Sequence, residues 1–317
     1  MNLRRAATLA LALLAACTGE VDAPSGLLEP LRVEGGSFVE SLPEAPTRGA
    51  PVVTSIDTAS GIVSVGQQGR ALVGRGSASA YAIAVRFAAL GSGWWVAPVQ
   101  DEDPTYPGER DFQVRYDVGG GVPPGLHSLQ LAAVDAVGRR GPTFELDVCV
   151  RDPAVPDNLN SCDPTIAPPA VVVALTWDRP VDLDLVVETP AGKRITFKRP
   201  SSAPGDGGEV PEELLKDPAL GRLIRDSNAD CAIDGRNSEA VVWQEPPTRG
   251  TYLVYADLFA VCGEPGALFA AAVYVRRAGA DGTFHLEEVE RATGSVVDLQ
   301  AAGGADAPLY VLSFEPP

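Results

Sequence analysis

Short runs in which every second side chain is apolar recur along most of the chain, and they restrict its fold more than any other feature. The segments 81–87, 112–118 and 144–150 read YAIAVRF, FQVRYDV and FELDVCV. A period of two places the apolar side chains of a segment on one face of a β-strand. The chain also holds 33 glycines and 28 prolines, which punctuate it too often for long helices. The pattern predicts an all-β fold.

The strand-like runs fall into two groups, at residues 51–150 and 169–317. They are separated by residues 151–168, a predicted linker that holds four prolines. Regular short strands at this spacing predict a β-sandwich for each group. In the first group, the segment PGLHSLQLAAVDAVG at 124–138 resembles the late strands of immunoglobulin and fibronectin-type sandwiches. In the second, residues 211–224 are expected to form one short helix that Pro218 limits to two turns.

The first residues predict export and a lipid anchor. A basic start at Arg4 and Arg5 precedes an apolar run at 6–16, which is too short to span a bilayer. The following LAAC, ending at Cys17, resembles the lipobox of bacterial lipoproteins, whose cysteine receives a diacylglyceryl group. The resemblance implies a signal peptide at 1–16, a membrane anchor on Cys17 and residence in the cell envelope. Thr18 favours the outer membrane by the sorting rule of enteric bacteria.

Residues 17–50 are rich in Pro, Gly, Ser and Glu and show no hydrophobic period. This composition predicts a flexible tether between the anchor and the first sandwich.

Four further cysteines stand at 149, 162, 231 and 262, and an even number in an exported chain predicts disulfides. Three pairings are possible. We favour Cys149 with Cys162 and Cys231 with Cys262, because each pair flanks a local segment. The alternation of 144–150 supports the first pair, since it turns Cys149 away from the core.

Four blocks of the second group occur in a recognisable order. They read WDRPVDLDLVVETPAG at 177–192, DSNAD at 226–230, NSEAVVW at 237–243 and PPTRGTYLVY at 246–255. Together they resemble the uncharacterised β-sandwich domain of YfaP-type bacterial proteins, which also occurs in myxobacterial surface lipoproteins. The resemblance covers roughly 165–277 and implies a sandwich fold, but no function. The chain departs from the family pattern at Asp184, where the family usually has His, and at 237–239.

Aspartates in two of these blocks raise the question of a metal. Alternation places Asp182 and Asp184 on one face of a strand, opposite an apolar face. We favour a solvated face for these two, and turn capping for the Asp and Asn side chains of 226–230. The alternative is a Ca²⁺ site, because calcium prefers several oxygens from closely spaced residues. Its ligands would be Asp182, Asp184, Asp226, Asn228 and Asp230.

The chain as a whole favours a non-catalytic binding or structural module over an enzyme. It has only two histidines and no motif of a hydrolase, metalloprotease or phosphate-binding loop, so a hydrolase is the least favoured alternative. With 42 acidic against 25 basic residues, it is not expected to bind nucleic acid. The partner is expected to be an unknown protein or glycan. Sugar or cell-wall binding is the main alternative function, with stacking on Trp94, Trp95 and Tyr106.

Overall fold

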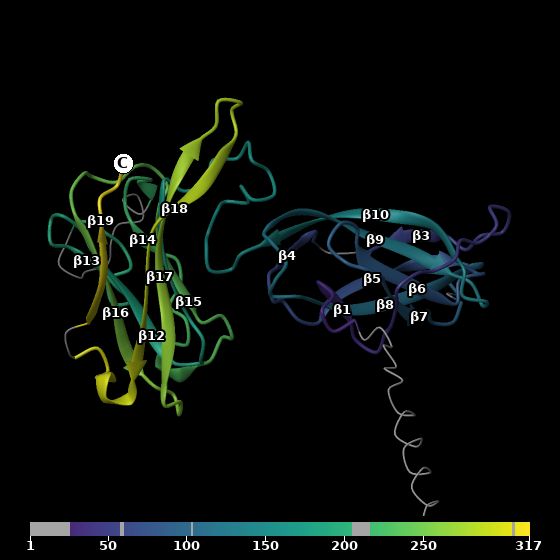
Figure 1. Ribbon diagram of the computed structural model, residues 1–317, viewed down its shortest axis with the longest axis horizontal. Helices are drawn as coiled ribbons and strands as arrows, with labels where there is room; N and C mark the ends of the chain where they lie inside the picture. Colours follow the sequence, from purple (N-terminus) through teal and green to yellow (C-terminus); the bar gives the residue numbers. More distant parts are fainter. Residues whose placement is uncertain (1–25, 58–59, 103, 205–215, 306–307) are drawn as a thin grey trace, which may run out of the picture.

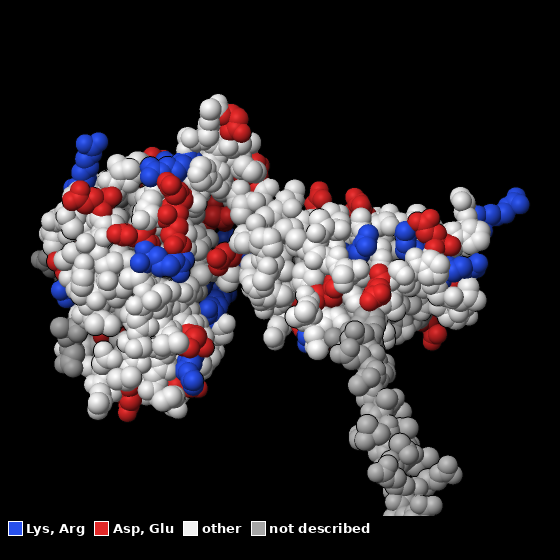
Figure 2. All heavy atoms as spheres, viewed as in Figure 1, with Lys and Arg blue, Asp and Glu red and all other residues white. Residues whose placement is uncertain are grey.

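A computed structural model describes residues 26–57, 60–102, 104–204, 216–305 and 308–317, and within these ranges the chain is all-β (Figure 1). Strands β1 to β10 form two sheets and β11 to β19 form two others, so the predicted pair of sandwiches is present. Acidic and basic side chains are interspersed over both bodies on the face shown in Figure 2. No helix in the described ranges is long and apolar enough to cross a membrane.

The first sandwich packs a four-stranded sheet against a six-stranded one. The four-stranded sheet has the order β1 (Leu31–Val33), β8 (Glu109–Val118), β5 (Arg70–Ser77), β3 (Val53–Ile56). The six-stranded sheet has the order β2 (Ser37–Val39), β7 (Trp94–Pro98), β6 (Ala82–Phe87), β9 (Gly125–Val134), β10 (Arg140–Arg151), β4 (Ile62–Ser64). All pairs are antiparallel except β10 with β4. Alternate residues such as Ile83, Val85 and Phe87 fill the core, as the sequence pattern predicts.

The second sandwich has a five-stranded and a four-stranded sheet. The first runs β14 (Arg222–Leu223), β15 (Ser238–Trp243), β11 (Val171–Trp177), β17 (Gly266–Ala278), β18 (Phe284–Val297). The second runs β13 (Arg194–Ile195), β12 (Asp182–Glu188), β16 (Tyr252–Ala260), β19 (Leu309–Phe314). Trp177, Trp243 and Tyr252 lie in the core between them. The Tyr252 hydroxyl donates to the Thr248 carbonyl at 3.0 Å, which closes a corner between two strands as in other sandwiches.

The prediction of a flexible tether is wrong for the part of 17–50 that the structure describes. Strand β1 pairs with β8 and β2 pairs with β7, so this segment contributes a strand to each sheet of the first sandwich. The side chain of Leu31 is 1% exposed and belongs to the core. Each of these strands is only three residues long, which is too short for a period of two to stand out in the sequence. The signal segment and Cys17 lie outside the described residues.

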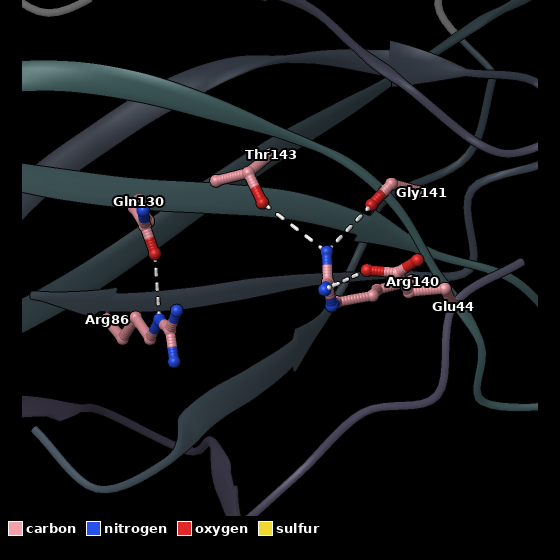
Figure 3. A network of polar contacts seen from close by, with 6 residues as sticks. All are labelled: Glu44, Arg86, Gln130, Arg140, Gly141 and Thr143. Atoms are coloured by element: carbon pink, nitrogen blue, oxygen red, sulfur yellow. Dashed lines mark hydrogen bonds and ion pairs between the residues drawn. The ribbon is translucent and has the colours of Figure 1, made fainter. Parts of the chain in front are cut away.

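From the last residue of β2 onward, the same segment crosses the outer face of the six-stranded sheet. Val39 and Leu42 pack there against Trp94 and three neighbouring small residues. Figure 3 shows the polar contacts beside this cover, where the Arg140 guanidinium donates to the Glu44 carboxylate at 2.6 Å. The Ala45 amide also donates to the Arg140 carbonyl at 2.8 Å. Residues 39–45 therefore form a strap over the first sandwich.

Both favoured disulfides, Cys149–Cys162 and Cys231–Cys262, are present. The first ties the end of β10 to the predicted linker, and this linker is bound to the second sandwich. The buried amide of Asn160 donates to the carbonyls of Ile166 at 2.8 Å and Phe284 at 2.9 Å. Val155 packs on the outer face of the five-stranded sheet.

The helix expected at 211–224 is absent from the described part of this segment, because Arg222 and Leu223 form β14. Residues 211–215 lie outside the described ranges.

Candidate metal centre

The candidate site lies along one edge of β12. Strand β13 pairs with β12 only at Val187 and Glu188, so the earlier part of this edge is open to another segment. The loop between β14 and β15 occupies it. Asn228 Nδ2 in this loop donates to the Val181 carbonyl at 2.9 Å, and Glu239 at the start of β15 accepts from the Leu185 amide at 2.8 Å.

The loop reaches this position through a tightly turned backbone. Asn228, Asp230, Cys231 and Asn237 all have positive φ, between 48° and 63°. Such φ values are uncommon outside glycine, although Asn and Asp tolerate them best. The turn directs the backbone N–H groups of Asp230 and Cys231 at the Asp182 carboxylate, which accepts from both.

Three carboxylates converge where this loop meets β12. One oxygen from each of Asp182, Asp184 and Asp226 lies within 4.8 Å of the other two. Asp230 joins them as a lining residue of a pocket of about 50 Å³. The structure thus brings together four of the five residues that the sequence proposed as calcium ligands.

Asn228, the fifth proposed ligand, is a structural residue. It is buried, and its amide nitrogen donates to the Val181 carbonyl and to Asn237 Oδ1 at 3.0 Å. Its Oδ1 accepts from the Asp234 amide at 3.0 Å. These bonds fix the conformation of the loop. They engage both polar atoms of the Asn228 side chain, which therefore does not act as a metal ligand.

The expectation that Asp182 and Asp184 face solvent is wrong. The alternation places them correctly, opposite the core residues Leu183 and Leu185. However, each is only 2% exposed. The residues that line the pocket with them come from distant segments, namely the 226–230 loop, Phe197 and Phe259. Periodicity within one strand gives no information on such long-range contacts.

Burial has a large electrostatic effect on these groups. It raises the pKa of Asp184 to about 8, with further increases from the nearby charges of Asp182 and Asp226, while Lys198 acts in the opposite direction. Burial likewise raises the pKa of Asp182 to about 6, against the two backbone N–H groups that stabilise its charged form. The pKa of Asp226 is raised too, first by desolvation and then by Asp230 and Asp234. The negative charges at this site therefore repel one another in a poorly solvated place.

One atom of the site lacks any partner among the described residues. Asp184 Oδ2 is buried and accepts no hydrogen bond there. Most buried polar atoms in folded proteins have a partner, because an unsatisfied one costs about 1 to 3 kcal/mol or more. An unpartnered oxygen on one of three converging carboxylates suits a cation ligand better than a hydrogen-bond acceptor.

Glu239 completes the site, although its role was not predicted from the sequence. Its carboxylate accepts from the Leu185 amide and, at 3.0 Å, from the Ser227 amide, so it joins β12 to the start of the loop. Burial raises the pKa of Glu239 well above its ordinary value, and the Asp184 charge adds to this effect. The signal was a single acidic residue in the otherwise apolar run EAVVW. Because both oxygens bind backbone amides, Glu239 positions the site.

The proposed aromatic platform is not formed. Trp94 and Trp95 lie in strand β7 and not in a loop, and they are 3% and 8% exposed. As expected for neighbours in a strand, they face opposite ways. Trp94 is under the strap with the Arg86 guanidinium 4.3 Å from its ring centre, and Trp95 packs in the core against Phe38. Tyr106 is exposed, with the Arg75 guanidinium 3.7 Å from its ring centre. Stacking of a sugar on the two tryptophans is therefore ruled out in this structure.

Comparison with known proteins does not assign the chain. No protein-family model matches it, and no curated protein matches it significantly.

Proposed function

We propose that the second sandwich is a calcium-binding module, with Asp182, Asp184 and Asp226 as ligands and Asp230 at the mouth of the pocket. The observation that carries the proposal is the convergence of three carboxylates, one of which, that of Asp184, has a buried oxygen without a hydrogen-bond partner among the described residues. The donors are all oxygens. The nearest cysteine, Cys231, is held in a disulfide, and no histidine lines the pocket. An all-oxygen, anionic set favours a hard cation such as Ca²⁺ over zinc or copper.

The role that fits such a site is stabilisation of the fold. A bound Ca²⁺ would join β12 to the 226–230 loop and offset the repulsion among their carboxylates. We therefore place the site in a non-catalytic binding or structural protein, in which calcium stabilises the second sandwich.

Thermal unfolding of the full chain, followed with and without calcium, tests this function. A ligand that binds only the folded state stabilises it by about 2.7 kcal/mol at one hundred times its Kd. We expect the transition of the second sandwich to rise in millimolar Ca²⁺ relative to EDTA, and Asp226→Ala to remove the rise. Asp298→Asn, which changes an exposed aspartate in the same sandwich, is the control and should keep it. The absence of a shift in the unmodified chain would contradict the proposal.

The cellular context is a further part of the proposal. Two disulfides support an oxidising, extracytoplasmic location. The lipobox-like LAAC supports a lipid anchor on Cys17 in the cell envelope, with the outer membrane favoured. Incorporation of labelled palmitate in a bacterial host, lost in Cys17→Ala, is the expected result; equal labelling of both proteins would exclude the anchor.

A further inference from the structure

With one oxygen from each pocket carboxylate, the protein does not fill the coordination shell of Ca²⁺. Calcium takes about six to eight oxygens. Asp182 also accepts two backbone N–H bonds, which occupy part of its lone-pair capacity. The oxygens of Glu239 accept from the amides of Leu185 and Ser227. Asn228 is similarly engaged. If Asp182, Asp184, Asp226 and Asp230 each give one oxygen, about two to four positions remain for other ligands.

Two aromatic residues line this pocket together with the carboxylates. Phe197, just after β13, and Phe259, at the end of β16, both line it and are both partly exposed. Their rings meet edge to face, with centroids 5.7 Å apart. A hydrated ion gains nothing from apolar rings beside its water ligands. A ligand that carries both oxygens and a hydrocarbon face gains from the ion and from the rings together.

The net charge of the site determines whether a neutral or an anionic ligand is favoured. Lys198 is close enough to act on Asp184, and with one Ca²⁺ it brings three positive charges to the four pocket carboxylates. With the Glu239 carboxylate included, the site still keeps a net negative charge, in a chain whose formal net charge is −17. An anionic ligand is therefore disfavoured, and a neutral one with adjacent hydroxyl groups is favoured.

We infer that the calcium site binds a neutral carbohydrate, with two adjacent hydroxyls of the sugar coordinating the ion and the C–H face of its ring lying against Phe197 and Phe259. This inference rests on the proposed calcium site. It differs from sugar binding in the first sandwich, because it needs neither Trp94 nor Trp95.

The test is binding of the full chain, in a detergent without a sugar headgroup, to an array of immobilised neutral glycans, acidic glycans and acidic peptides. We expect retention on neutral glycans in calcium and loss of retention in EDTA. Phe197→Ala and Phe259→Ala should each weaken retention about tenfold. Calorimetry on the same variants should show unchanged calcium affinity. Phe259→Leu, which keeps apolar volume without a flat ring, guards against simple loss of folding and should also weaken retention.

Tyr310→Ala is the matched control, because Tyr310 is an exposed aromatic residue of the same four-stranded sheet. It should bind glycans normally. Calcium binding without retention on any neutral glycan would overturn this inference and leave the calcium site intact. Retention that persists in EDTA, retention only on acidic ligands, or full retention by both Phe→Ala variants would also overturn it. Failure of the unmodified chain to bind calcium would remove the proposed function and this inference together.

Discussion

Asp184 is the single residue that most determines the chemistry of the second sandwich. Its Oδ2 is buried without a partner in the described structure, and its carboxyl group has a pKa raised to about 8 by burial first and by neighbouring carboxylates second. In calcium-free protein, ionised Asp184 therefore destabilises the fold, whereas with calcium it becomes a ligand. The same side chain has opposite effects in the two states.

Asp184→Asn should reverse the sign of the stability change between these states. Above pH 8 in EDTA, the amide removes a buried charge, and we expect stabilisation of about 1 to 3 kcal/mol. In calcium, the variant should lose the stabilisation that the ion gives to the unmodified chain. Chemical unfolding of both proteins in both buffers measures the effect, with Asp298→Asn expected to change neither value by more than about 0.5 kcal/mol. Destabilisation by Asp184→Asn in EDTA would contradict this account.

The raised pKa values also predict how calcium-free protein responds to pH. Asp182 and Asp184 have pKa values of about 6 and about 8, against an ordinary value of 3.8. Across that interval the folded state binds more protons than the unfolded state, so stability falls as pH rises and levels off above about pH 8. The carboxyl groups with lowered pKa, such as that of Asp135, titrate below this window and act at more acidic pH.

Unfolding midpoints of the second sandwich in EDTA, measured from pH 5 to pH 9, provide the test. We expect a decline over this range and a calcium effect that grows over it, because ligand carboxylates must be ionised. A stability that rises between pH 5 and pH 8 in EDTA would be inconsistent with buried carboxylates at this site.

For these single residues, the sequence predicted which face of the strand Asp182 and Asp184 occupy, but not whether that face is exposed to solvent. The face follows from a local period of two. The burial follows from contacts with a loop more than 40 residues away in the sequence, which no local pattern contains. Glu239 was missed for a related reason, since its role depends on a hydrogen bond to the edge of β12.

Among the elements, the loop between β14 and β15 connects the disulfide framework to the metal site. Cys231 contributes a backbone N–H to Asp182 and its sulfur to the bond with Cys262. The other disulfide, Cys149–Cys162, lies at the end of the first sandwich, and neither of its cysteines lines the pocket.

Removal of each disulfide should therefore have different consequences. By loop-closure entropy, Cys231→Ser with Cys262→Ser and Cys149→Ser with Cys162→Ser should each cost about 3 to 4 kcal/mol. Only the first pair should also weaken calcium binding in a calorimetric titration, because it frees the loop that carries Asp226 and Asp230. Equal effects of the two pairs on calcium affinity would show that the loop geometry does not matter to the site.

The short strands β1 and β2 could not be recognised from the sequence pattern. Three-residue strands in a Pro-rich and Gly-rich segment do not reveal a period, yet Leu31 is buried in the core. In a flexible tether, Leu31→Ala would be nearly neutral. In the structure it should cost about 2 to 5 kcal/mol. Leu28→Ala is the control, since Leu28 is 100% exposed, and equal stabilities of the two variants would restore the tether interpretation.

At the scale of the whole molecule, the all-β class and both disulfide pairs follow from the sequence. The period of two defines strands, the proline-rich segment separates two groups of them, and an outward Cys149 can reach Cys162. The proline-rich segment was predicted as a linker between the two groups of strands, but its attachment to both sandwiches was not predicted. Residues 152–168 are fastened to the second sandwich through Asn160 and Val155, and to β10 through the disulfide. These attachments depend on tertiary contacts and not on composition.

The most direct measurement is a crystal structure of the chain grown with calcium, with anomalous scattering used to locate the ion. We predict one Ca²⁺ bound by oxygens of Asp182, Asp184 and Asp226 at about 2.3 to 2.6 Å, with Asp184 Oδ2 among the ligands. A water molecule or the Lys198 ammonium group in that position, with no anomalous peak at millimolar calcium, would contradict it.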